Sequence, residues 1–298
     1  MSFERSPPGS DHAPCRYGDS KLAFRGPAVD PAAPHVVVIG SSEVHGRYVP
    51  DPLTDRLARA LDRPVANLGV QNGGVDVFAK DEALLAHAAG ADLAVVQVMG
   101  AQNLSNRLYT VHPRRNDRFL RHSKKMTKLF PEVDFSDFVF TGHMLCDLRD
   151  RDPARFERVV AELREAWTAR MTTLLDGFAC PKVLLWLDGD AAPGDLGRPP
   201  LFVTDAMVDD LRDDVDVVLR ADMRTADAAG EFDDLDFDPS EVESARLTMA
   251  PSSHATLADR LAPVLKDLLS RADPAREVDP APADRTPGTN EEGDATAA

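Results

Sequence analysis

Four short stretches of the chain carry residue types that together suit acyl transfer. Ser42 follows the β-branched run at residues 36–39, Gly73 lies in a glycine-rich turn, Asn103 follows a later apolar run, and His254 stands near the C-terminal end. A serine nucleophile needs a base to accept its proton and donors to stabilise the tetrahedral oxyanion. We predict Ser42 as the nucleophile and His254 as the base, with three oxyanion donors: the N–H groups of Ser42 and Gly73 and the carboxamide of Asn103.

Each of these residues also has an ordinary structural explanation. A serine at the end of a strand often hydrogen-bonds the backbone of its turn. Gly73 suits a turn that needs positive φ, and Asn103 suits a loop that its side chain caps. His254 follows two serines at the start of an apolar helix pattern, which is typical of an N-cap region.

Strand and helix patterns alternate along the chain. Buried apolar runs predict strands at residues 36–39, 65–68, 93–99, 182–187 and 215–219, and amphipathic patterns predict helices at 53–62, 76–89, 152–178, 204–212 and 254–269. This alternation predicts a doubly wound, mostly parallel five-stranded α/β sheet with helices on both faces, in a single domain. The turns after the first three strands then open at one edge, where such sheets bind ligands.

Composition divides the chain into parts. Residues 1–33 are rich in proline, glycine and polar residues and predict a flexible lead-in, with a short ordered piece near Tyr17–Phe24, to a domain at 34–270. Residues 100–150 show no clear periodicity and predict an irregular cationic loop inside that domain. Residues 271–298 lack apolar anchors and predict a disordered acidic tail.

The net charge of −16 argues against a general nucleic-acid binder, because phosphate backbones require cationic surfaces. No stretch has the apolar length of a signal peptide or a membrane span, so we expect a cytoplasmic protein without membrane insertion. The three cysteines are scattered and form no metal-binding spacing. We therefore expect neither a metal nor a cofactor.

One segment is cationic although the chain is acidic. From Arg107 to Lys128 there are eight arginines and lysines and one acid, Asp117. Arginine engages carboxylate, phosphate and sulfate groups with two hydrogen bonds. A solvated face is the simpler explanation of such a run, but the segment follows Asn103 directly, so it also predicts binding of an anionic substrate. The candidate substrate-binding residues are Tyr109, His112, Arg114 and Arg115.

The chain resembles the SGNH, or GDSL-type, hydrolase superfamily in the order of four short blocks. They are Gly40-Ser41-Ser42 after strand one, Asn67-Leu68-Gly69 through Gly73 after strand two, Gly100-Ala101-Gln102-Asn103 after strand three, and Ser253-His254. The resemblance covers residues 36–269 and implies that Ser42, rather than Ser41, is the nucleophile. The chain also looks like an uncharacterised bacterial family that shares its NLG-x-x-N and VHPRRNDRF stretches.

Three departures from the superfamily pattern bear on the chemistry. Ser41 stands where members carry an aspartate, Gln102 competes with Asn103 as the amide donor, and Pro251 replaces the acid three residues before the histidine. That acid normally orients the histidine and stabilises its cation. A Ser-His dyad, an acid supplied by Asp188 or Asp190, and an inactive site all remain open.

Three functional hypotheses follow. The first is a serine esterase or acyltransferase that acts on a small or carrier-bound anionic substrate. The second is a catalytically degenerate binding protein that recognises an anionic glycan, nucleotide or protein through the cationic segment. The third is a flavodoxin-like nucleotide- or flavin-binding domain, although the first turn lacks the GxGxxG and GxxxxGK[ST] spacings. The oligomeric state stays open.

Overall fold

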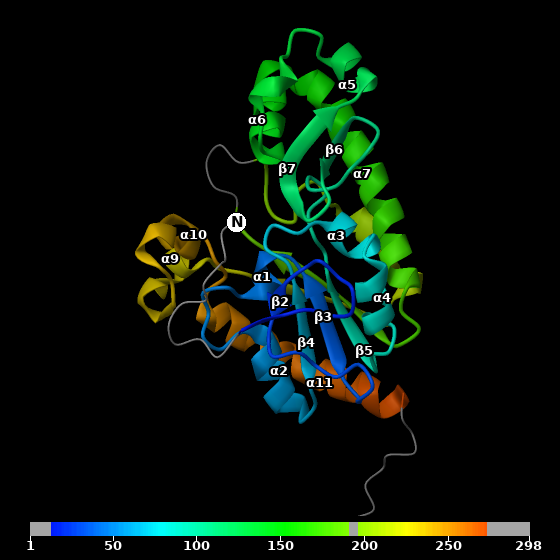
Figure 1. The fold of residues 1–298 in the computed structure, drawn as a ribbon, viewed down its shortest axis with the longest axis vertical. Coiled ribbons are helices and arrows are strands. Elements are labelled where there is room, and N and C mark those ends of the chain that lie inside the picture. The colour runs from blue at the N-terminus through cyan, green and yellow to red at the C-terminus, as the bar shows by residue number, and fades with distance from the viewer. Residues whose placement is uncertain (1–12, 191–195, 273–298) are drawn as a thin grey trace, which may run out of the picture.

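A parallel five-stranded sheet forms the centre of the protein (Figure 1), whose computed structural model describes residues 13–190 and 196–272. Its strands are β3 (Val36–Gly40), β4 (Val65–Gly69), β5 (Leu93–Gln97), β8 (Lys182–Asp188) and β9 (Val217–Asp222). They lie in the order β4-β3-β5-β8-β9, and every neighbouring pair is parallel. The predicted doubly wound α/β fold is confirmed, including the reversal of winding beside β3.

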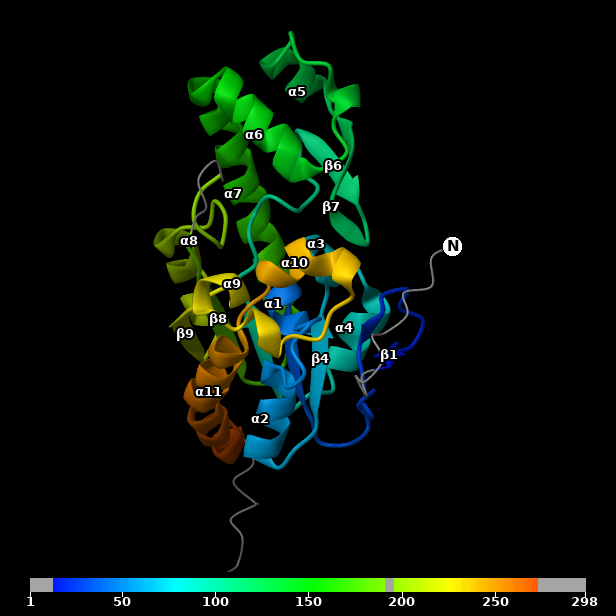
Figure 2. The ribbon, with the colours of Figure 1, turned by 90° about the vertical axis from the view of Figure 1, so that its left-hand side faces the viewer.

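Helices cover both faces of the sheet because alternate strand residues point to opposite sides. Val36 and Val38 face a cluster formed with α2 (Leu53–Leu61) and α11 (Pro251–Ala272), which Figure 2 shows side by side. On the other face, strand residues such as Val37 and Ile39 belong to a cluster that includes α4 (Glu82–Ala88) and the long α7 (Pro153–Asp176).

Several element boundaries differ from the sequence prediction. The helix expected at 76–89 is two helices, α3 (Val75–Ala79) and α4, because the Asp81 side chain accepts a hydrogen bond from the Leu84 N–H and starts a new helix. The last helix begins earlier, at Pro251, and therefore places His254 inside its first turns. The fourth predicted helix shortens to α8 (Asp205–Asp209).

The segment expected to be an irregular loop is folded. It contains an antiparallel hairpin, β6 (Tyr109–His112) and β7 (Arg115–His122), followed by α5 (Lys124–Leu129), a 3-10 turn η1 (Phe135–Asp137) and α6 (Thr141–Arg151). Its aromatic and aliphatic side chains join the main core through α7. We call residues 105–151 the cap, which forms the upper end of the molecule in Figure 1.

Part of the predicted lead-in is also ordered. β1 (Pro14–Cys15) pairs with β2 (Phe24–Arg25), and Tyr17, Leu22 and Phe24 are buried in the main core. This ordered piece coincides with the one expected near Tyr17–Phe24, although its apolar residues are few and spaced without periodicity. The remainder of the lead-in, residues 1–12, and most of the predicted acidic tail, residues 273–298, lie outside the described residues.

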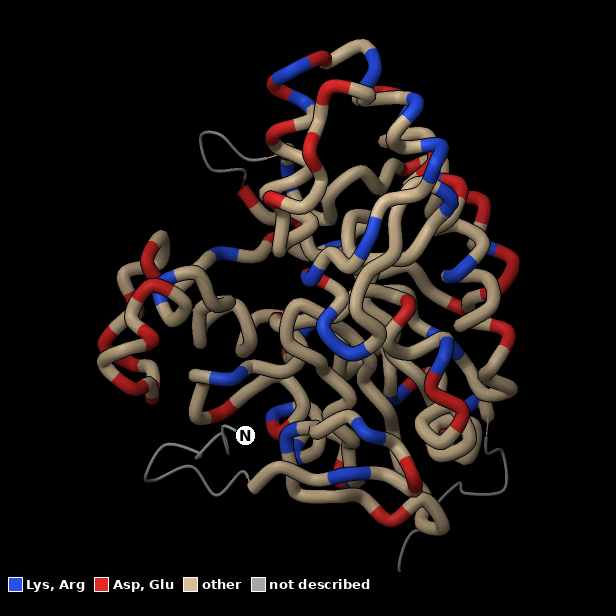
Figure 3. Tube along the Cα trace, turned by 45° about the horizontal axis from the view of Figure 1, so that its top comes forward, with Lys and Arg blue, Asp and Glu red and all other residues tan. Residues whose placement is uncertain are grey.

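A small lobe of short elements follows β9. It contains α9 (Ala226–Ala229), the turns η3 (Phe232–Asp234) and η4 (Pro239–Glu241), and α10 (Val242–Arg246), and it packs on Tyr48 and Val49 after the first helix. Figure 3 shows acidic residues over this lobe and basic residues over parts of the cap. Within residues 13–190 and 196–272, no helix combines the length and the apolar character needed to cross a membrane.

We predict that Trp167→Ala destabilises the protein by about 3 to 5 kcal/mol in urea unfolding. Trp167 is fully buried on α7, and its Nε1–H donates to the Met99 carbonyl, 2.7 Å away, just after β5. The substitution removes both the packing and this hydrogen bond. Arg158→Ala, at an exposed position of the same helix, is the control and should change the free energy of unfolding by no more than about 0.5 kcal/mol.

Candidate functional site

Two glycines bring the first turn of the site close to the sheet. A Cβ on Gly40, the last residue of β3, would overlap the Gln97 side chain, and a Cβ on Gly69 would overlap the backbone nitrogen of His45. The short helix α1 (Ser42–His45) therefore packs directly over the ends of β3 and β4. This close approach places Ser42 beside the turn that follows β4.

The hydroxyl of Ser42 contacts that turn. Its Oγ accepts a hydrogen bond from the backbone N–H of Asn72, with 2.9 Å between N and Oγ. Asn72 has a φ of 53°, in the left-handed region that asparagine tolerates better than most residues. Ser41 is engaged elsewhere, because its N–H donates to Gln97 Oε1 at 2.8 Å, and Gln97 in turn donates to Glu43.

Asn103 lies against the same turn. Its Nδ2 donates to the Asn72 carbonyl oxygen at 3.3 Å, and its Oδ1 lies 2.8 Å from the Thr141 hydroxyl. Thr141 is buried at the start of α6, and its hydroxyl also lies 3.1 Å from the Asp117 carbonyl oxygen, a second acceptor for its proton. The cap therefore orients the Asn103 carboxamide, with its NH₂ group on the Asn72 side. Gln102 instead folds against Gly100, and its Oε1 has no hydrogen-bond partner.

The N–H of Gly73 is occupied within its own turn. It donates to the Val70 carbonyl at 2.9 Å, so in this conformation it is not directed at a ligand. The N–H that faces Ser42 is the preceding one, of Asn72. Gly74 is tied to the cap, because its N–H donates to Oδ1 of the buried Asn116 at 3.2 Å.

His254 is enclosed rather than presented to the site. Its side chain has no exposed surface, and its Nδ1 accepts the N–H of Leu53, 3.1 Å away, at the start of α2. Its Nε2 has no partner, and it makes no hydrogen bond to Ser42. Burial, with the positive charges of Arg25 and Arg56, lowers the pKa of His254 to about 3. In this structure His254 caps a helix as a neutral imidazole.

The two aspartates considered as replacement acids have partners other than His254. Asp188 accepts the indole N–H of Trp186 at 2.7 Å, and Asp190 is exposed near Arg198 at 3.6 Å. Neither hydrogen-bonds the histidine, whose polar contact is with Leu53. Within the part of the chain that the structure describes, no group of three or more histidines, cysteines and acids is placed to hold a metal ion.

Tyr109 and His112 shape the cap. Tyr109 is 1% exposed and its hydroxyl donates to the Gln102 carbonyl at 2.6 Å, and burial raises its pKa above the usual range. His112 Nδ1 accepts the N–H groups of Arg114 and Arg115, each at 3.2 Å, and so closes the hairpin turn. Both side chains thus support the backbone around the site.

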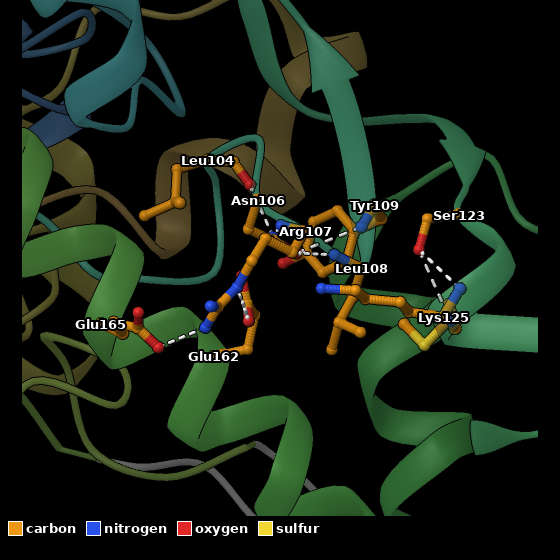
Figure 4. Close-up of polar contacts among 10 residues, drawn as sticks. Leu104, Asn106, Arg107, Leu108, Tyr109, Ser123, Lys125, Glu162 and Glu165 are labelled. Carbon is orange, nitrogen blue, oxygen red and sulfur yellow. Dashed lines mark hydrogen bonds and ion pairs between the residues drawn. The ribbon is translucent and has the colours of Figure 1, made fainter. Parts of the chain in front are cut away.

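The side chains of Arg114 and Arg115 are exposed at that turn and make no ion pair within the described residues. The neighbouring Asn116 anchors the turn to Gly74, next to the Asn72 turn. Arg107 differs from them, as Figure 4 shows: it pairs with Glu162 and Glu165 of α7 and is neutralised there. Within the described residues, the unpaired positive charge of this segment therefore begins at Arg114.

The sequence analysis missed three residues that build the site, Gln97, Asn116 and Thr141, and placed Asn72 at the sheet edge without assigning it a role. Gln97 carried a signal, because it is a polar residue within a continuous apolar strand and is only 5% exposed. Asn116 and Thr141 carried none, since their contacts join segments far apart in the chain.

These features define an α/β protein with a polar site at the carboxyl edge of a doubly wound parallel sheet. Residues 1–269 match the family described as Domain of unknown function (DUF6473), and the chain belongs to that family. No curated protein sequence matches it. A solved structure of a family two carbohydrate esterase from Clostridium thermocellum in complex with cellohexaose is similar with 11% identity and a TM-score of 0.41, covering 83% of this chain and 68% of that chain.

The enclosed histidine predicts acid sensitivity. The unfolded chain protonates His254 near pH 6.5, whereas the folded protein resists protonation until about pH 3. This contribution to stability is complete above pH 6.5 and is lost as the pH falls from 6.5 to about 3. In His254→Asn the amide oxygen can still accept the Leu53 N–H, but the side chain no longer titrates. Between pH 6.5 and 3, the free energy of unfolding of this variant should therefore fall less steeply than that of the wild type, with slopes that differ by up to ~1.4 kcal/mol per pH unit. Parallel pH curves for the two proteins would contradict the assignment.

Proposed function

We propose that the protein is a hydrolase-like esterase or acyltransferase in which Ser42 accepts the acyl group of an anionic substrate. The observation that carries this proposal is the convergence of Ser42, Asn72 and Asn103 at the carboxyl edge of the sheet. The unpaired Arg114 and Arg115 lie on a turn anchored to the same edge and supply positive charge for the substrate.

The chemistry assigns each group a task. Ser42 Oγ bonds to the acyl carbon while its proton passes to His254, and the leaving alcohol or thiol then takes that proton. The oxyanion is stabilised by the N–H of Asn72, in place of Gly73, and by the Asn103 carboxamide. Water or an acceptor alcohol afterwards removes the acyl group from Ser42.

The proposal requires a second conformation. None of the described side chains accepts the Ser42 proton, and His254 is held by the Leu53 N–H under α1. The reactive state therefore differs from this structure in the first turn of α11, where His254 leaves Leu53 and reaches Ser42. Conformational steps in loops and domains accompany substrate binding in many enzymes.

A fluorophosphonate probe tests the covalent step. The wild type should label on Ser42, as located by mass spectrometry of the tryptic peptide, and Ser42→Ala should not label. Ser41→Ala is the matched control and should still label, because Ser41 contributes its backbone N–H to Gln97 rather than its hydroxyl to the site. A wild type without label, or equal label on Ser42→Ala, rules out Ser42 as a nucleophile.

A second function is favoured by the enclosure of His254. If His254 serves only to accept the N–H at the start of α2, the carboxyl edge of the sheet binds an anionic ligand and catalyses no reaction. The third hypothesis, a nucleotide or flavin site, rests on no observed contact beyond the shared sheet edge, and we do not carry it forward.

The binding function predicts a dependence on the two unpaired arginines. Arg114→Ser with Arg115→Ser should weaken binding of ATP or a sulfated disaccharide at least about 100-fold in titration calorimetry, because each charged hydrogen-bonded pair contributes about 1.5–3 kcal/mol. Arg158→Ser with Lys266→Ser, both exposed and distant in sequence, makes the same change in net charge and should leave affinity unchanged. Equal losses in both variants would point to net charge alone.

A further inference from the structure

Three large apolar side chains are exposed on two paired segments of the cap. Leu120, Val139 and Phe140 expose 53%, 51% and 46% of their surface. The two segments are neighbours because the Phe119 N–H donates to the Val139 carbonyl, and Arg118 pairs with Phe140 in an antiparallel bridge. Clustered exposed apolar residues on a soluble protein commonly mark a binding surface.

Positive charge accompanies this apolar surface. The Arg118 guanidinium lies over the Phe140 ring, 5.5 Å from its centroid, and makes no ion pair with the described residues. Arg121 is exposed beside Leu120 and likewise has no acidic partner in the described part of the chain. We call Arg118, Leu120, Arg121, Val139 and Phe140 the cap patch.

The cap patch adjoins the candidate site along the chain. Phe140 directly precedes Thr141, whose hydroxyl lies 2.8 Å from Asn103 Oδ1. Since consecutive Cα atoms are 3.8 Å apart, the Phe140 backbone lies within roughly 10 Å of the Asn103 carboxamide. Asn103 in turn contacts Asn72, the donor to Ser42. The backbone that carries Phe140 is thus linked to Ser42 through Thr141, Asn103 and Asn72.

We propose that the cap patch binds the apolar part of an amphiphilic substrate whose anionic group lies near Arg114 and Arg115. This rests on the proposed function in naming Ser42 as the reacting group, but the binding claim stands without catalysis. An alkyl chain or ring on Leu120, Val139 and Phe140 removes their apolar surface from water. Arg118 and Arg121 add attraction for an anion at the edge of that surface.

A second copy of the chain fits the cap patch less well. A stable dimer buries about 800 Å² on each partner, much more than three half-exposed side chains supply. Two such patches meeting about a two-fold axis would also bring Arg118 and Arg121 of one molecule against those of the other. The size and charge of the cap patch match a small anionic amphiphile better.

The test measures affinity against chain length. Alkyl phosphates from ethyl to decyl, kept below micelle formation, are titrated into the full chain by calorimetry. In the wild type, affinity should rise up to about 4-fold for each methylene that is buried. Leu120→Ser with Phe140→Ser should flatten this dependence while leaving ethyl phosphate binding intact. Arg114→Ser with Arg115→Ser should weaken all members by a similar factor.

The control is Leu247→Ser, which removes an apolar side chain outside the cap patch. Leu247 is 74% exposed on the acidic lobe that follows β9. It should keep the full dependence on chain length. The inference is overturned if affinity does not depend on chain length, or if the cap-patch variant and wild type show the same dependence. It is also overturned if the cap-patch variant changes the mass measured by sedimentation from dimer to monomer without changing alkyl phosphate binding.

These outcomes separate the inference from the proposed function. Loss of the chain-length dependence in Leu120→Ser with Phe140→Ser supports the apolar subsite even if Ser42 takes no fluorophosphonate label. If Ser42 takes the label but affinity does not depend on chain length, the result supports acyl transfer and rules out an amphiphilic substrate on the cap patch.

Discussion

The site depends on the close approach of α1 to the ends of two parallel strands. Gly40 and Gly69 pair across β3 and β4, and neither position has room for a Cβ under the first turn. Asn67 reinforces this contact, because its amide donates to the Val44 carbonyl at 3.0 Å. With α1 held this close, the Ser42 hydroxyl meets the Asn72 N–H. A larger residue at either glycine would lift the serine away from its donor.

Two polar networks meet under this turn and have different consequences. On the outer side, Ser42, Asn72 and Asn103 form a connected set that opens toward the cap. On the inner side, His254 Nδ1 accepts the Leu53 N–H at the start of α2, and the ring is shielded from water. Because the ring is buried, protonation of His254 would destabilise the fold. The acyl transfer proposed above would require His254 to give up that contact.

Two of the side-chain contacts between the cap and the rest of the domain act directly on the site. Thr141 holds the Asn103 carboxamide, and Asn116 holds the turn after β4. The same segment presents unpaired arginines in a chain whose net charge is −16. Most arginines elsewhere on the surface pair with acids, as Arg107 does with α7, so the free guanidinium groups at Arg114 and Arg115 concentrate positive potential near the site.

The sequence alone determined the architecture, because strand and helix periodicities are local and a parallel sheet requires long buried runs such as residues 36–39 and 93–97. It also located the edge where Ser42 and Asn103 lie, since turns after parallel strands meet there. Only the tertiary structure decided which atoms meet. That Asn72 rather than Gly73 faces the serine, that Thr141 orients Asn103, and that His254 caps α2 depend on contacts between residues far apart in the chain, for which no local pattern exists.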